Sequence, residues 1–316
     1  MLLPKPRGAF SAEVLEALRS DPTKLAGDLP EPESHDDSAI ALWALYELHG
    51  HGFEDLDEDP EWHPDAIALR GRLERDLESR LRERWAGEVP EGDDFAETFF
   101  AYVEAFEGPS LARHVQVAAT EEQVLDLLKA RSIYHLRETD PSVWVVPRLD
   151  TRPKAALMEM LYDEFGGGDP NKLHHHLFAR GLDAIGLRSD YGAYVDDVPM
   201  EALEQNNTWM LIGMNRRLRG AAVGHFAAFE ATSSVPSRRI VQGLERLGFD
   251  ESIRTYYATH VTADAAHEQV AVRGVCAPMV EAEPGLRDDV WFGAFTCLDQ
   301  EARLARALFS HWGVAA

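Results

Sequence analysis

Apolar positions recur with a period close to that of an α-helix along most of the chain, which predicts a helical protein. The clearest example is Pro64–Trp85, where leucines recur every fourth residue from Leu69 to Leu81 among alternating Arg and Glu. No alternating β-branched run bounded by hairpin turns occurs, apart from the ambiguous Val143–Leu149. The fold class is therefore predicted to be all-α. The further segments expected to be helical are Ser38–Leu48, Phe95–Phe106, Glu121–Leu136, Lys154–Phe165, His174–Leu187, Pro199–Thr232, Ser237–Leu247, Ser252–Val272 and Asp288–His311.

Three segments depart from this helical pattern. Residues 1–35 are rich in Pro, Gly, Asp and Glu, so we expect a mobile arm with one short helix around Ala12–Leu18. The glycines Gly166–Gly168 lack the following lysine and the preceding strand of a phosphate loop, and they are interpreted as a helix terminator. Glu47 and the two histidines that follow it are interpreted as the polar end of a helix, because side chains two positions apart do not face each other.

Composition narrows the class of protein. The chain has 316 residues, of which 45% are apolar, which is enough for a sizeable core and too many for a disordered chain. Lys and Arg total 31 against 55 Asp and Glu, so the net charge of −24 argues against binding to nucleic acid or an anionic membrane. No uncharged stretch is long enough to cross a bilayer, the N-terminus lacks the apolar core of a signal peptide, and only two cysteines occur. We expect a soluble, cytoplasmic protein without a disulfide framework or a cysteine-based zinc site.

One predicted helix, Ser252–Val272, carries metal-ligating side chains on one face. His260, Asp264 and His267 follow one another at offsets of four and three positions. At about 100° per residue they fall within a sector of about 60°, so the three side chains can point toward one place. Two imidazoles and a carboxylate form half of a transition-metal site, with iron, manganese or zinc favoured over calcium or magnesium. The alternative is a solvated polar face, although the same helix also has apolar residues to bury.

Two further segments offer ligands of the same kind. Glu164 closes the helix Lys154–Phe165, and His174 opens the next helix ten residues later, after the glycines. The break in the chain allows these two side chains to meet at a junction of helix ends. Glu230 follows the run Gly220–Phe229, whose small residues allow close helix packing, so we expect this carboxylate to be at least partly buried and therefore paired or metal-bound. A role for Glu230 as a C-terminal helix cap is disfavoured by the helix dipole.

Together these segments supply three carboxylates and three imidazoles to a common interior, and the six residues are Glu164, Glu230, Asp264, His174, His260 and His267. Helical bundles build dinuclear carboxylate–histidine iron sites from such side chains. Three carboxylates offset most of the charge of two divalent ions and leave coordination positions open for O₂ and a substrate. The six residues therefore predict a catalytic, oxygen-activating metal centre rather than a saturated structural site.

This arrangement resembles the haem-oxygenase-like di-iron oxidases and oxygenases, a family also described as iron-containing redox enzymes. The pattern of that family is a glutamate, a histidine about ten residues later, a second glutamate far downstream, and then His-x₃-Asp/Glu-x₂-His. Here the pattern falls on Glu164, His174, Glu230 and His260-x₃-Asp264-x₂-His267. The sequences around Asp163–Gly168 and Ala228–Ser234 are similar as well, and weaker similarity covers most of the chain.

The resemblance implies a fold and an assembly. The fold is a bundle of about seven core helices shaped like haem oxygenase, with two irons in place of haem. Residues 116–316 would form this core, and residues 1–115 would form an N-terminal arm and helical extension packed on it. The extension is a candidate dimer surface, so a homodimer is expected.

The resemblance also implies roles at the site. O₂ would be the co-substrate and would form a peroxo-di-iron(III) intermediate, and an external electron donor would act with the enzyme. One iron would be held by Glu164, His174 and His267 and the other by His260 and Asp264, with Glu230 bridging or completing the site.

The expected reaction is N-oxygenation or oxidative cleavage of a small amino acid or amine, because nothing in the sequence marks a long acyl tunnel. One alternative is a fatty-acid oxidative decarboxylase of the same fold, and another is a non-catalytic binding or regulatory module of haem-oxygenase shape. A mononuclear zinc hydrolase needs three ligands and an open water, fewer than the six residues offer. The number of bound metal ions separates these hypotheses.

Overall fold

The computed structural model describes residues 1–57, 59–87 and 89–315, and within these ranges the chain forms helices and no β-strand. The predicted all-α fold class is thus confirmed. No helix in this part of the chain is both long enough and apolar enough to cross a membrane. The α-helices are α1 (Ala9–Ser20), α2 (His35–Glu47), α3 (Pro64–Arg84), α4 (Phe95–Ala105), α5 (Leu111–Val117), α6 (Glu121–His135), α7 (Asp140–Val143), α8 (Thr151–Glu164), α9 (His174–Ala184), α10 (Met200–Met214), α11 (Arg219–Leu247), α12 (Glu251–Gln269), α13 (Ala277–Ala282) and α14 (Arg287–His311).

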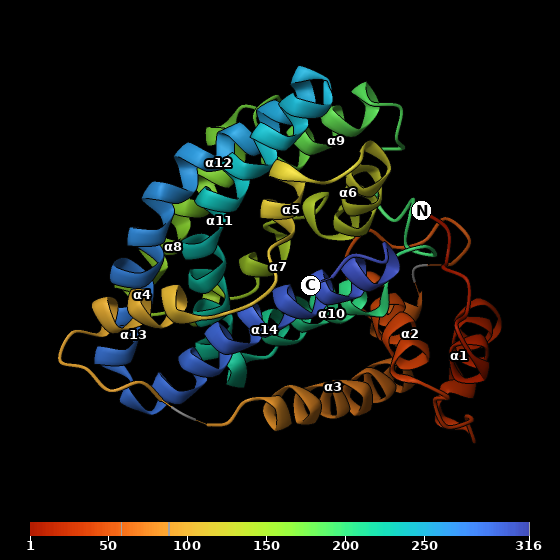
Figure 1. Ribbon diagram of the computed structural model, residues 1–316. Helices are drawn as coiled ribbons and strands as arrows, with labels where there is room; N and C mark the ends of the chain where they lie inside the picture. Colours follow the sequence, from red (N-terminus) through yellow and green to blue (C-terminus); the bar gives the residue numbers. More distant parts are fainter. Residues whose placement is uncertain (58, 88, 316) are drawn as a thin grey trace.

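Helix α11 is the centre of the fold. It packs along α12 and α14, and α5 contacts it as well (Figure 1). A Cβ atom on Gly224 of α11 would lie 1.9 Å from the carbonyl oxygen of Val290, and one on Gly293 of α14 would lie 2.0 Å from that of Ala221. Glycine is therefore required where these two helices cross, because their backbones are in contact there.

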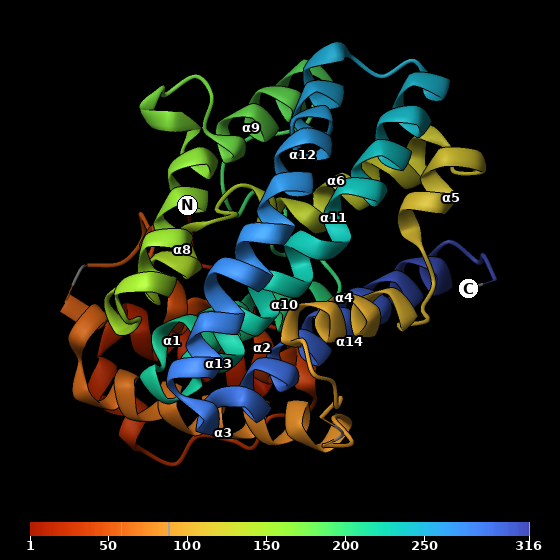
Figure 2. The ribbon, with the colours of Figure 1, turned by 90° about the vertical axis from the view of Figure 1, so that its left-hand side faces the viewer.

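The N-terminal helices α1, α2 and α3 lie together at one end of the molecule in both views (Figures 1 and 2). Helix α1 packs on α2, and α2 packs on α10. The helix expected near Ala12–Leu18 is present and longer, and Phe10 and Val14 on it are fully buried. This part of the N-terminal arm is therefore packed against the rest of the protein. The leucine stripe from Leu69 to Leu81 is buried, as the pattern predicts.

The boundaries predicted for the central helices are wrong in two places. The segment Pro199–Thr232 is not one helix, because Asn215 has an extended backbone and its side-chain amide donates to the Leu211 carbonyl, which ends α10. Conversely, α11 continues through Pro236, although proline removes a helical hydrogen bond. Packing along α12 and α14 supports α11 here, and the Ser234 hydroxyl donates to the Val261 carbonyl of α12 at 3.0 Å. As a result, Glu230 lies in the interior of a long helix.

Candidate metal centre

Side chains from five segments meet between α8, α9, α11 and α12. Glu138 comes from the turn after α6, and it joins five residues predicted from the sequence. Two groups have potential ligand atoms that all lie within 4.8 Å of one another, and these groups are Glu138, Glu164, His174 and His260, and Glu164, Glu230 and His267. Each of these side chains is buried, with 4–7% of the residue surface exposed. Glu164 belongs to both groups, so the two groups share one carboxylate.

The glycines after α8 bring Glu164 and His174 together. Gly166, Gly167 and Gly168 all have positive φ angles, between 62° and 86°, which residues with a Cβ atom rarely adopt. A Cβ atom on Gly166 would also lie 2.7 Å from the backbone nitrogen of Leu173. The chain therefore turns back on itself, and the Nδ1 atom of His174 lies 2.7 Å from the Oε2 atom of Glu164. The sequence predicted this meeting at the junction of helix ends.

Each of the two histidines of α12 points one ring nitrogen into the cluster, and a neighbouring polar group contacts its other ring nitrogen. In His260, Nδ1 lies 2.8 Å from the carbonyl oxygen of Tyr256, and Nε2 faces Glu138 at 3.5 Å. In His267, Nε2 lies 3.0 Å from a carboxylate oxygen of Asp163, and Nδ1 lies 3.3 Å from Glu164. Metal-ligating histidines are usually oriented in this way, by a hydrogen bond from the nitrogen that does not bind the metal.

Four buried, inward-facing atoms make no well-aligned hydrogen bond, although imidazoles and carboxylates lie close to one another here. They are Nδ1 of His174, Oε2 of Glu230, Nε2 of His260 and Nδ1 of His267. Buried polar atoms are nearly always satisfied, so imidazole nitrogens and carboxylate oxygens that lie 2.7–3.5 Å apart without well-aligned hydrogen bonds need an explanation. Imidazole nitrogens and carboxylate oxygens are ligands that iron accepts. The residues present therefore fit a buried iron site.

The charges of the cluster lead to the same interpretation. Burial, together with the charge of Glu164, raises the pKa of Glu230 to about 7. Although burial opposes a charge on His267, its contacts with Glu164 and Glu230 raise the pKa of this histidine to about 11. The protein alone thus balances its carboxylates with protons. A bound cation would replace those protons and allow the imidazoles to act as neutral ligands.

Asp264 is buried, but it does not join either group. Its exposed fraction is 1%, and its Oδ2 atom accepts a hydrogen bond of 2.6 Å from the hydroxyl of Ser233 on α11. Burial and the charge of Glu230 raise the pKa of this carboxyl to about 8. Asp264 therefore lies next to the cluster, and its role as a ligand stays a prediction.

Glu138 is the residue that sequence reasoning missed. It stands among Arg137, Thr139 and Asp140, a group typical of an exposed turn, yet only 7% of its surface is exposed. The hydroxyl of Tyr256 donates to its Oε1 atom at 2.9 Å. The one available signal was its position directly after a helix with apolar residues at its end. Glu138 also changes the grouping, because the structure pairs His174 with His260, whereas the resemblance pairs His174 with His267.

Comparisons with known proteins identify a family described as containing iron. The model of a family described as "iron-containing redox enzyme" matches residues 125–302. A nitrosourea synthase from Streptomyces achromogenes subsp. streptozoticus is 30% identical over 124 residues, which are 39% of this chain and only 26% of that protein. A 4-chloro-allylglycine synthase from Streptantibioticus cattleyicolor is 26% identical over 211 residues, which are 65% of this chain and 79% of that protein.

One solved structure supports the fold alone. A CADD-like protein of unknown function from Nostoc punctiforme PCC 73102 superimposes with a TM-score of 0.51 at 15% sequence identity. The superposition covers 76% of this chain and 99% of the other chain.

Proposed function

The chain belongs to the family of iron-containing redox enzymes, and from this premise we propose that it is a non-haem di-iron oxygenase acting on a small amino acid or amine. The family makes it an oxidoreductase. The finer assignment includes the number of irons, the use of O₂ and the reaction, which is N-oxygenation or oxidative cleavage of the substrate.

The observation that carries the proposal is the carboxylate of Glu164, which is shared by two groups of buried ligands. A shared carboxylate between two sets of imidazoles and carboxylates suits two adjacent cations rather than one. A mononuclear zinc site would not need the second group. The proposed ligands of the first ion are Glu138, Glu164, His174 and His260, and those of the second are Glu164, Glu230 and His267, with Asp264 as a further ligand. All of them lie within the proposed core of residues 116–316.

Bound iron would supply the electrons that reduce O₂, and the protein supplies the geometry of the site. The Tyr256 carbonyl and the Asp163 carboxylate fix the rings of His260 and His267 from outside. The hydroxyl of Tyr256 holds Glu138 in the same way. Because the cluster is buried, bulk water is kept from the reacting atoms.

The substrate class is supported by the relatives. One is named a nitrosourea synthase, and the other is named a 4-chloro-allylglycine synthase, a name that denotes an amino acid product. The first match spans only 26% of that protein, so the reaction of this chain is proposed from its own site and from the family together.

Anaerobic titration with Fe(II), followed by rapid mixing with O₂ and absorbance measurements, tests the proposal. We expect two equivalents of Fe(II) to bind and a transient visible absorption band to form. Amino acids or amines should then accelerate the decay of that band. One equivalent or none, without a transient, would overturn the di-iron assignment. Acceleration by fatty acids alone would favour the decarboxylase alternative.

A further inference from the structure

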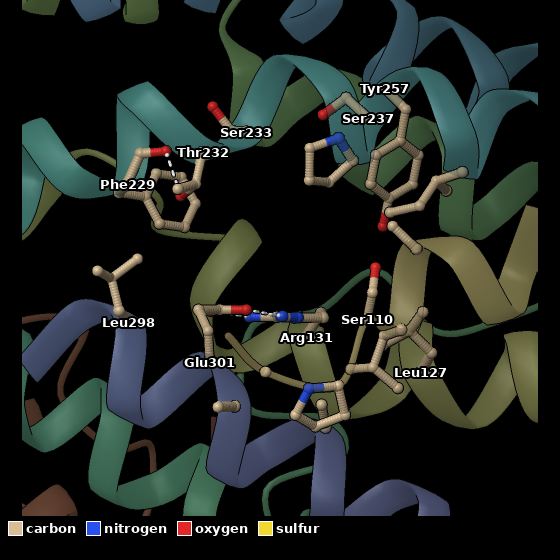
Figure 3. A pocket seen from close by; sticks show the side chains of 18 of the residues that line it. Ser110, Leu127, Arg131, Phe229, Thr232, Ser233, Ser237, Tyr257, Leu298 and Glu301 are labelled. Carbon is tan, nitrogen blue, oxygen red and sulfur yellow. Dashed lines mark hydrogen bonds and ion pairs between the residues drawn. The ribbon is translucent and has the colours of Figure 1, made fainter. Parts of the chain in front are cut away.

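A cavity of about 310 Å³ lies beside the metal centre. Its walls come from α6, α11, α12, α14 and the segment Phe106–Ala112 (Figure 3). Pockets that bind small molecules begin at about this size and combine apolar walls with a few polar groups. Here the apolar part includes Leu127, Phe229 and Leu298, and the polar part includes Arg131 and Glu301, which are not among the proposed metal ligands.

One ion pair stands in the wall of this cavity. The guanidinium of Arg131 on α6 binds both carboxylate oxygens of Glu301 on α14, at 2.7 and 2.5 Å. The side-chain amide of Gln205 donates to the same carboxylate. The side chain of Arg131 is 12% exposed and that of Glu301 is 31% exposed, and Figure 3 shows the pair at the edge of the open space. The pair is thus fixed from behind and accessible from the cavity.

The cavity reaches the metal centre along two helices. On α11, Phe229 lines the cavity directly before Glu230, and Ser233 lines it while its hydroxyl donates to Asp264. On α6, His135 lines the cavity one helical turn, about 6 Å, after Arg131. The Nδ1 atom of His135 lies 3.3 Å from Glu138. A molecule anchored at the ion pair would therefore extend toward the proposed iron ligands.

We propose that Arg131 and Glu301 recognise the head group of a zwitterionic α-amino acid, whose side chain extends along α11 toward the metal centre. This inference rests on the proposed function and names the residues that select the substrate. The carboxylate of the ligand takes guanidinium donors that Glu301 and Gln205 leave free, and its ammonium group takes remaining lone pairs of Glu301.

The charge of the pair explains why a zwitterion fits better than other small ligands. Arg131 and Glu301 neutralise each other, so a ligand with both charges adds no net charge to the cavity. A fatty acid or a simple amine would leave one uncompensated charge among apolar walls, which is costly.

Three matched ligands test the inference on the unmodified protein. L-norleucine, hexanoate and pentylamine share an alkyl chain and differ in the head group alone. With the chain of 316 residues under anaerobic conditions and with Fe(II) added, calorimetry should give norleucine an affinity at least about 10-fold higher than that of hexanoate or pentylamine. Equal or tighter binding of hexanoate or pentylamine would overturn the inference, and so would failure of norleucine and all proteinogenic amino acids to bind.

Substitutions then test the two residues. Glu301→Gln should weaken norleucine binding by about 30-fold or more, since it removes one partner of a desolvated charge contact. Arg303→Gln, on the same helix but outside the cavity lining, should leave norleucine binding unchanged. Equal affinity in the wild type and in the Glu301 variant would mean that the ion pair is only structural.

The same experiments separate this inference from the proposed function. The Glu301 variant should still bind two equivalents of Fe(II), because its side chain is not among the proposed ligands. If iron loading and the O₂ transient are present but amino acids do not bind, the inference fails while the di-iron assignment stands. If amino acids bind and iron does not, the di-iron assignment fails while the inference about Arg131 and Glu301 stands.

Discussion

Two buried glutamates show how a structural carboxylate differs from a proposed metal ligand. Glu47 is fully buried at the end of α2, where Arg137 and the hydroxyl of Tyr191 bind the same carboxylate oxygen. Burial opposes its charge, yet Arg137 and the neighbouring donors hold the pKa of Glu47 below its ordinary value. Glu230 is also buried, but it faces another glutamate and an imidazole, and its pKa rises to about 7. A fixed arginine completes the first site, whereas the second lacks a permanent cation.

The largest effect is expected from Glu164→Gln, because this carboxylate belongs to both ligand groups. Loss of a hydrogen-bonding partner of a ligand already costs 10–100-fold in metal affinity or activity, so loss of a shared ligand should cost more than about 100-fold in turnover. Anaerobic Fe(II) titration should give fewer than two equivalents. Glu159→Gln, an exposed residue on the same helix, is the matched control. Two tightly bound irons in the Glu164 variant would contradict the role of Glu164 as a ligand shared by both sites.

The opposite case is Arg137→Met, which leaves Glu47 charged and without its cation. Breaking a buried ion pair by removing one partner typically costs about 3–5 kcal/mol of unfolding free energy. Urea denaturation of the metal-free protein should therefore show a large loss of stability. Arg152→Met is the matched control, since Arg152 pairs with Glu281 at the surface, and it should cost less than about 1 kcal/mol. A loss below that value for Arg137→Met would mean that Glu47 does not depend on this arginine.

Several features of the candidate metal centre could be predicted from the sequence. The face carrying His260 and His267 follows from helical periodicity, and the meeting of Glu164 with His174 follows from the glycine turn. The burial of Glu230 follows from the small apolar run before it, and its exposed fraction is 4%. In each case the decisive information is local, within one helix or one turn.

Other features depend on residues far apart in the chain and were missed. Glu47 does end a helix, as the sequence indicates, but its burial could not be predicted, because Arg137 lies 90 positions away and is brought to it only by the fold. The partners Arg131 and Glu301 are 170 positions apart. Glu138 stands in a segment whose composition is that of a surface turn. Charged residues are seldom buried unless paired, so a single sequence favours the exposed interpretation of such residues.

Glu230→Gln is expected to stabilise the metal-free protein, whereas Arg137→Met is expected to destabilise it. The pKa of Glu230 is about 7 in the folded, metal-free protein and 4.5 as the unperturbed value. The folded state thus holds a proton that the unfolded state has lost between these pH values, and stability falls as the pH rises through this window. At pH 8 the metal-free variant should be more stable than the wild type, by about 1–3 kcal/mol. Thermal unfolding with and without Fe(II) measures this, and added iron should stabilise the wild type more than the variant. A destabilised metal-free variant would place Glu230 with Glu47 as a structural carboxylate.

The smallest effect is expected for Asp264→Asn, because Asp264 combines features of both kinds of carboxylate. Like Glu230, it is buried and has a raised pKa, but like Glu47 it already has a donor, the hydroxyl of Ser233. To bind a metal it must lose its proton, and Ser233 already engages one of its two oxygens, so both features reduce its contribution. We therefore expect Fe(II) titration of the variant to show two sites, the weaker of them about 10-fold weaker than in the wild type. Glu268→Gln on the same helix should leave both sites unchanged. If Asp264→Asn abolished one site, Asp264 would be a full ligand that takes a different position when iron is bound. If it changed neither site, the carboxylate would serve only to join α11 and α12.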